Sequence, residues 1–114
     1  MSANDRPVIL CVDDATDLLA LMGRALGEDY RVITVANGAD AIAAALAEPR
    51  PDLILLDIDM PGVSGLQVCR ALKGEVRTAD IPVVFLTARN GMQAQVEGFE
   101  AGAVDYITKP FNAF

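Results

Sequence analysis

The side chains best able to do chemistry in this sequence are three aspartates, a threonine and a lysine, each at the end of a short apolar run. They are Asp13, Asp14, Asp57, Thr87 and Lys109. Three neighbouring carboxylates repel one another unless a cation offsets their charge or a pKa rises. A partly open site of carboxylate oxygens suits a hard divalent ion, above all Mg²⁺, which shares its ligands with a phosphate. The set therefore predicts a magnesium site for a phosphoryl group.

The role of each residue follows from its functional group. Asp13 and Asp14 sit together and are suited to share the metal, whereas Asp57 stands alone between this doublet and the lysine. Lys109 offers a point charge and Thr87 a hydroxyl donor, and both can hold phosphoryl oxygens. The sequence has no histidine, and no serine or cysteine follows these apolar runs as an alternative nucleophile. A carboxylate that attacks phosphorus gives an aspartyl phosphate, so we predict Asp57 as the acceptor.

Each of these residues also has an ordinary structural interpretation. An aspartate after a strand often caps a helix or shapes a turn, and so can a threonine, while a single lysine is often a solvated surface charge. The inference depends on the whole set of residues, because these polar side chains follow four of the five apolar runs.

Five short runs are expected to be the strands that position these side chains. They cover residues 8–12, 31–36, 53–56, 81–86 and 104–108. Residues 16–26, 39–46, 65–74 and 90–103 repeat apolar side chains at helical spacing, and in the second helix we expect one face of Ala39, Ile42, Ala43 and Leu46. Strands that alternate with helices imply a parallel sheet covered on both faces. The residues after each strand then meet at one edge of that sheet.

The composition limits the classes of partner. A length of 114 residues supports one domain. A net charge of -7 argues against binding to nucleic acid or to a membrane surface, because both need a basic face. No apolar run reaches the ~18 residues of a membrane span. Cys11 and Cys69 lie in apolar stretches, which indicates buried thiols in a reducing compartment. We therefore expect a cytoplasmic domain.

Four segments closely resemble the receiver domain of two-component response regulators, the CheY-like superfamily. They are VILCVDD (8–14), LILLDIDMPGVSGLQVCR (53–70), VVFLTA (83–88) and GAVDYITKPF (102–111). The resemblance implies a three-layer α/β flavodoxin-like fold with a five-stranded parallel sheet in the order 2-1-3-4-5. It also implies a signalling domain and not an enzyme: a sensor histidine kinase or phosphotransfer protein donates a phosphoryl group, self-phosphorylation and slow autodephosphorylation occur, and a conformational switch controls an output.

The resemblance also assigns the metal ligands. Asp14 and Asp57 would bind Mg²⁺ directly, together with the backbone carbonyl of Asp59, and Asp13 would contribute mainly through water. Mn²⁺ is the expected substitute for Mg²⁺.

The resemblance further implies a switch. Thr87 and Lys109 would hold the phosphoryl oxygens, and Thr87 would be drawn toward the phosphate. An aromatic on the fifth strand, here Tyr106, would then turn inward; the alternative for Tyr106 is an ordinary half-buried strand tyrosine. The bond between Lys109 and Pro110 matches a family peptide bond that is usually cis.

The sequence departs from the family pattern in two places. Ser64 stands where many members have aspartate, and both can cap a helix. The chain stops at Phe114, where the fifth helix should begin, so we expect a truncated receiver or the leading module of a longer protein with an output domain. Ile107 would then be exposed, and the face through which phosphorylated receivers form homodimers would be incomplete. In this fold we expect Arg89 and Asp59 to flank the mouth of the site, either as an ion pair that slows the attack of water or as two separately solvated charges.

Two other functions compete with this one. Asp57 and Asp59 form a D-x-D arrangement, as in haloacid-dehalogenase-type phosphatases, although those enzymes usually carry it on the first strand of a longer chain. A receiver-like interaction module that is never phosphorylated is the other rival. Such modules usually lack an acidic-pair residue, the acceptor or the lysine, and this sequence has all of them.

Overall fold

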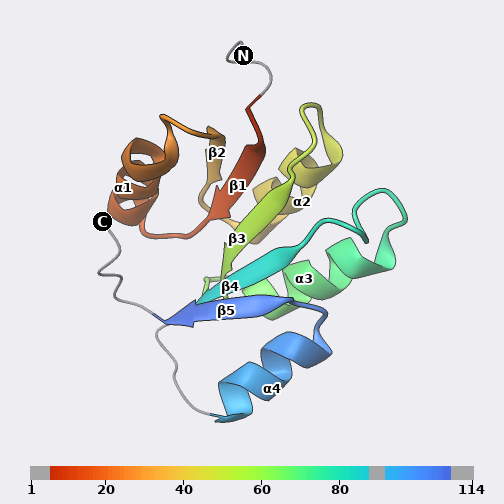
Figure 1. The fold of residues 1–114 in the computed structure, drawn as a ribbon. Coiled ribbons are helices and arrows are strands. Elements are labelled where there is room, and N and C mark those ends of the chain that lie inside the picture. Colours follow the sequence, from red (N-terminus) through yellow and green to blue (C-terminus); the bar gives the residue numbers. More distant parts are fainter. Residues whose placement is uncertain (1–5, 88–91, 109–114) are drawn as a thin grey trace.

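The computed structural model describes residues 6–87 and 92–108. Its sheet consists of β1 (Val8–Val12), β2 (Arg31–Val35), β3 (Leu53–Asp57), β4 (Val83–Thr87) and β5 (Asp105–Thr108). Its helices are α1 (Thr16–Leu26), α2 (Gly38–Leu46), α3 (Gly65–Gly74) and α4 (Met92–Glu100). All neighbouring strands pair in parallel in the order β2-β1-β3-β4-β5 (Figure 1). The predicted fold class and strand order are confirmed.

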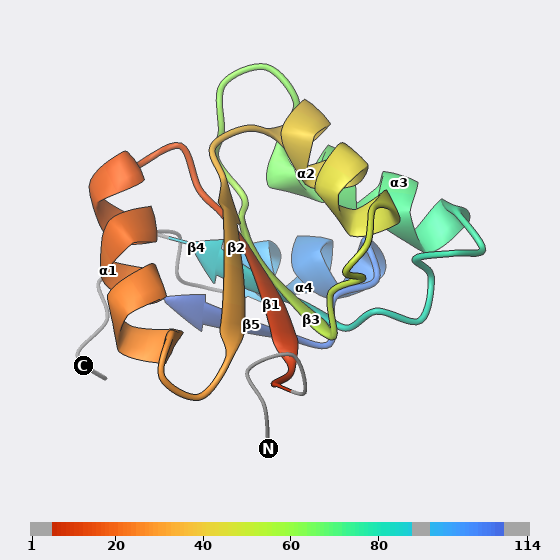
Figure 2. The ribbon, with the colours of Figure 1, turned by 90° about the horizontal axis from the view of Figure 1, so that it is seen from above.

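The helices cover the two faces of the sheet unequally (Figure 2). On one face α1 packs Leu19 and Met22 onto a small apolar cluster that includes Cys11. On the other face α2, α3 and the end of α4 cover a larger cluster around Phe85 and Leu56. Strands with both faces covered need apolar side chains at successive positions. This requirement explains why β1 is buried at all five positions.

The edge strands differ from the three central ones. β2 contains only exposed and half-buried residues, which suits its mixture of polar and β-branched side chains. At the opposite edge Ile107 is 44% exposed, which confirms the expected exposure, and Val104, which directly precedes β5, is 59% exposed. Within the described residues, no helix has both the length and the apolar character needed to span a bilayer.

The predicted face of α2 is partly wrong. The structure buries Ala41 and Ala45, whereas Ala39 and Ala43 are exposed and Ile42 is half-buried. Leu46, the last residue of the predicted face, is half-buried. Five of the nine residues of α2 are alanines, and the spacing of such small, identical side chains does not mark a face. The orientation of α2 is set instead by its tertiary contacts with α3 and β1.

Candidate functional site

The predicted site residues on three strands lie at the same edge of the sheet. Asp13 follows β1 directly, while Asp57 and Thr87 are the last residues of β3 and β4. β3 lies between β1 and β4, so Asp57 is at the centre of that edge (Figure 1). The carboxyl edge of an open parallel sheet is where ligands bind in this class of fold. The structure therefore brings these three predicted residues to one edge of the sheet, as their positions after the apolar runs indicate.

The three carboxylates form one cluster. One oxygen from each of Asp13, Asp14 and Asp57 lies within 4.8 Å of the others. Asp13 and Asp57 are buried, at 0% and 4% exposure, whereas Asp14 is open to solvent. The Asp13 side chain is oriented by a hydrogen bond that the Ala15 N–H donates to its Oδ1 at 2.9 Å. This all-oxygen set, partly buried and open on one side, fits a hard divalent cation that keeps some of its waters.

The backbone after Asp57 is held closely from two sides. The Ile58 N–H donates to the Leu86 carbonyl at 3.2 Å, which extends the contact of β3 with β4. The Gly65 N–H, at the start of α3, donates to the Ile58 carbonyl at 2.8 Å. A Cβ on Gly65 would overlap the carbonyl oxygen of Asp57. Residue spacing along the chain does not predict this contact. The small size of Gly65 lets α3 begin directly against the peptide of Asp57.

The loop between β3 and α3 exposes one residue of the predicted site. Ile58 and Met60 are buried, and Asp59 between them is exposed. Two buried apolar neighbours therefore hold Asp59 at the surface, immediately after Asp57. Ser64 ends the loop as the N-cap of α3, a role that the sequence allows, and it forms a complete capping box with Gln67.

Thr87 and Tyr106 lie on adjacent strands. Thr87 is 1% exposed, and it is paired in register with Thr108 of β5. Tyr106 is half-buried, and its ring meets that of Phe99 edge-on, with centroids 6.4 Å apart. The predicted roles of Lys109, of its bond to Pro110, and of Arg89 fall on residues outside those that the structure describes.

The thiol near the site does not offer a competing nucleophile. Cys11 is two residues before Asp13 and fully buried on the α1 face. Burial raises its pKa to about 12, so the thiol stays protonated at neutral pH, and only the thiolate is a strong nucleophile. Burial also raises the pKa of Cys69. Both cysteines are free and buried, as predicted.

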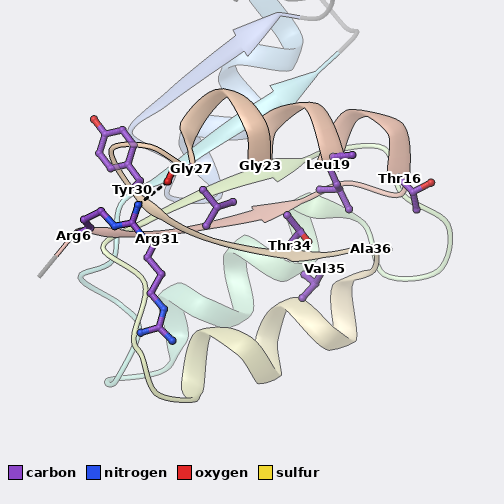
Figure 3. Close-up of a pocket in the computed structure, with 12 residues that line it drawn as sticks. Arg6, Thr16, Leu19, Gly23, Gly27, Tyr30, Arg31, Thr34, Val35 and Ala36 are labelled. Atoms are coloured by element: carbon purple, nitrogen blue, oxygen red, sulfur yellow. Dashed lines mark hydrogen bonds between the residues drawn. The ribbon is translucent and has the colours of Figure 1, made fainter. Parts of the chain in front are cut away.

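A separate open groove runs along the outer side of β2 (Figure 3). It lies between α1 and β2, and it extends from Arg6 and Tyr30 at one end to Thr16 and Ala36 at the other. Gly23 and Gly27 form part of its wall. None of the predicted site residues in the described chain lines this groove, so the acidic cluster and the groove are distinct features.

Comparisons with known proteins agree with this geometry. The family model described as "Response regulator receiver domain" matches residues 9–113. The response regulator PleD of Caulobacter vibrioides is 44% identical over 91% of this chain and 23% of its own length. The phosphate regulon transcriptional regulatory protein PhoB of Klebsiella pneumoniae is 46% identical over 91% of this chain and 45% of its own. The chain thus spans from about a quarter to about a half of these relatives.

Solved structures match over nearly the whole chain. The chemotaxis protein CheY4 of Vibrio cholerae superposes with a TM-score of 0.88 at 30% identity, covering 94% of this chain and 89% of that one. The response regulator TrrA of Thermotoga maritima in complex with Mg²⁺–BeF superposes with a TM-score of 0.80 at 33% identity, covering 93% and 89%. With its strand order, its acidic cluster and these matches, the chain belongs to the family of response regulator receiver domains.

Proposed function

We propose that Asp57 is the phosphoacceptor of this receiver domain. One carboxylate oxygen of Asp57 forms a bond to the phosphorus of a phosphohistidine, and the P–N bond of the donor breaks. The electron pair of that bond stays on the imidazole of the donor. The observation that carries the proposal is the position of Asp57 at the end of the central strand, with its carboxylate within 4.8 Å of both Asp13 and Asp14.

The acidic cluster is proposed to hold Mg²⁺, or Mn²⁺ in its place. Asp14 and Asp57 would be direct ligands together with the backbone carbonyl of Asp59, and Asp13 would act mainly through water. When bound, the ion would offset the charge that develops on the phosphoryl oxygens. Among the relatives of known structure, Rcp1 is described as Mn²⁺-bound and TrrA as a complex with Mg²⁺–BeF. The exposed side of the cluster at Asp14 leaves room for a phosphodonor.

Other side chains of the domain would then position the phosphoryl group and change conformation when it binds. Thr87, buried at the end of β4, is proposed to donate its hydroxyl to one phosphoryl oxygen, and Lys109 to hold another. Movement of Thr87 toward the phosphate would open space that Tyr106 fills from β5. The half-buried ring of Tyr106 against Phe99 supports this role, because an inward turn would remove that ring from the surface of α4.

The partners are proposed from the family. A sensor histidine kinase or a phosphotransfer protein would be the donor, in the cytoplasm. Because the chain spans less than half of PleD and PhoB, we propose that it is one module, residues 1–114, of a protein with an output domain. Homodimerisation through the α4–β5 side is proposed as well. Direct contact of this module with nucleic acid or membrane is not expected at its net charge of -7.

Intact-mass spectrometry after incubation with acetyl phosphate and Mg²⁺ tests the proposal. We expect one added phosphoryl group on the wild type and none on Asp57→Asn, with Asp80→Asn, an exposed aspartate after α3, as the matched control that still gains it. Addition should stop when EDTA removes the metal. An unmodified wild type would instead support the interaction module, and rapid turnover of a small phosphomonoester would support the phosphatase.

A further inference from the structure

We propose that Gly38 is a positioning residue that sets the distance between the acceptor Asp57 and the acidic doublet. Gly38 is the first residue of α2 and lies outside the family-derived set of site residues. The proposal rests on the proposed function, because it takes the acidic cluster as the metal and phosphoryl site.

Gly38 lies in a close contact between α2 and the loop that follows β3. The residue is buried, and a Cβ built on it would lie 2.9 Å from the Cβ of Val63 and 2.9 Å from Cγ2 of Val68. Real Cβ atoms essentially never approach other atoms below 3.0 Å. The loop and α2 can therefore meet at this distance only because residue 38 has no side chain.

The contact continues from Val63 to the acceptor. Val63 is two residues before Gly65, whose N–H donates to the Ile58 carbonyl at 2.8 Å. Gly65 also rests against the carbonyl oxygen of Asp57. A displacement of Val63 thus reaches the peptide of Asp57 through a short stretch of chain that has close contacts at both ends.

The corner of the chain between β2 and α2, residues 35–38, also contacts the acidic doublet. The Asp13 N–H donates to the Val35 carbonyl at 3.3 Å, and Val35 is the last residue of β2, three residues before Gly38. The corner between β2 and α2 therefore touches the backbone of Asp13 on one side and, through Val63, the loop after Asp57 on the other. It acts as a spacer between the two halves of the cluster.

A side chain at residue 38 would move the loop more readily than the helices. The start of α2 is fixed by Asn37, whose side chain accepts the Asp40 N–H at 2.9 Å, and Val68 is fully buried in α3. Val63 is 39% exposed, so it can shift toward solvent. We therefore expect Gly38→Ala to displace the loop outward and to loosen the metal site.

The test measures metal affinity and loop position separately. Electron paramagnetic resonance of free Mn²⁺ should show that Gly38→Ala binds the ion about tenfold more weakly, the loss typical when a supporting contact of a metal site is removed. In the metal-free protein, the Val63 methyl resonances should shift. Gly23→Ala is the matched control, because a Cβ on this helical glycine meets nothing within 4 Å. Thr78→Val is the control for lost stability, because it removes a buried hydrogen bond to the Leu72 carbonyl.

Each outcome decides the proposal. Weaker Mn²⁺ binding in Gly38→Ala, with both controls at the wild-type affinity, supports it. Wild-type affinity in Gly38→Ala overturns it, as does an equal loss in Thr78→Val, which would trace the effect to stability in general. A wild type that binds no Mn²⁺ overturns the proposed metal site, and the positioning role with it.

Discussion

Gly65 has no side chain, and this lets α3 begin in contact with the backbone of Asp57. A Cβ there would overlap the backbone of Asp57, which cannot rotate away as a side chain can. We expect Gly65→Ala to lower the free energy of unfolding by about 1–3 kcal/mol, the cost of forcing atoms into a packed interior. Urea denaturation measures this change.

The matched control for Gly65→Ala is Gly23→Ala in the middle of α1, where the new methyl group meets nothing within 4 Å. It should raise the free energy of unfolding by about 0.5–1 kcal/mol, because alanine loses less entropy in a helix than glycine. If both variants changed stability in the same direction, the contact with Asp57 would not be what requires glycine at residue 65.

The buried thiol of Cys11 should make the folded protein less stable as the pH rises above 9. Burial raises its pKa from 9.0 to about 12, whereas the thiol of the unfolded chain keeps the ordinary value. Below pH 9 both states hold the proton, so the thiol gives no pH dependence there. Above it, the unfolded chain loses the proton first, and stability should fall by up to about 1.4 kcal/mol per pH unit.

Denaturation curves of wild type and Cys11→Ala between pH 7 and about pH 10.5 isolate this effect. The variant is less stable at pH 7 because of the cavity that it leaves, but the difference between the two proteins should shrink as the pH rises. A difference that stays constant with pH would mean that the Cys11 thiol ionises equally in both states.

What the sequence could predict at this scale was the type of residue at each strand end. Asp13, Asp57 and Thr87 follow apolar runs, and the parallel topology brings them to one edge without any tertiary detail. The contacts of Gly38 and Gly65 could not be predicted in this way. They depend on distances of a few ångströms between α2, α3 and the loop after β3, which residue spacing along the chain does not contain.

Among the elements, α3 begins directly against the backbone of Asp57. The Ser64 hydroxyl oxygen accepts a hydrogen bond from the Gln67 N–H. In turn, the Ser64 N–H donates to Oε1 of the Gln67 side chain at 2.9 Å. We expect Ser64→Ala to cost about 0.5–2 kcal/mol of stability. Ser64→Asp should stay within about 0.5 kcal/mol of wild type, since aspartate caps helices as well as serine does and also favours the positive end of the helix dipole.

Thermal and urea unfolding of both Ser64 variants measures this prediction. Gln67→Ala removes only the second half of the capping box and should fall between wild type and Ser64→Ala. A loss in Ser64→Asp as large as in Ser64→Ala would show that the serine is needed for something other than capping, and the departure from the family pattern would then be functionally relevant.

The elements also differ in how clearly their sequences specify them. In α3, Val68, Cys69 and Leu72 form a distinct apolar stripe, and all three are buried. In α2 the alanines mark no face, and the predicted face was partly wrong. Hydrophobic periodicity therefore located both helices along the chain, but it oriented only the helix whose apolar residues are large.

The whole molecule carries a net charge of -7, with three carboxylates concentrated at one edge of the sheet. Both features oppose the compact state, and a divalent ion at the cluster would relieve the local repulsion. A ligand that binds only the folded chain stabilises it by about 2.7 kcal/mol at a concentration one hundred times its dissociation constant. We therefore expect Mg²⁺ to raise the melting temperature and EDTA to reverse the gain.

Ion binding must be separated from the screening of the overall charge. NaCl at equal ionic strength screens the net charge but lacks a divalent ion for the cluster, so it should give only a small part of the gain. Asp14→Asn removes one proposed ligand and should lose most of the Mg²⁺ effect, whereas Asp80→Asn changes the net charge equally and should keep it. Equal stabilisation by NaCl and Mg²⁺, or an equal response of the two variants, would mean that Mg²⁺ acts on the surface charge as a whole. Stabilisation that is specific to Mg²⁺ and depends on Asp14 would locate the ion at the carboxylate cluster, at the ends of β1 and β3.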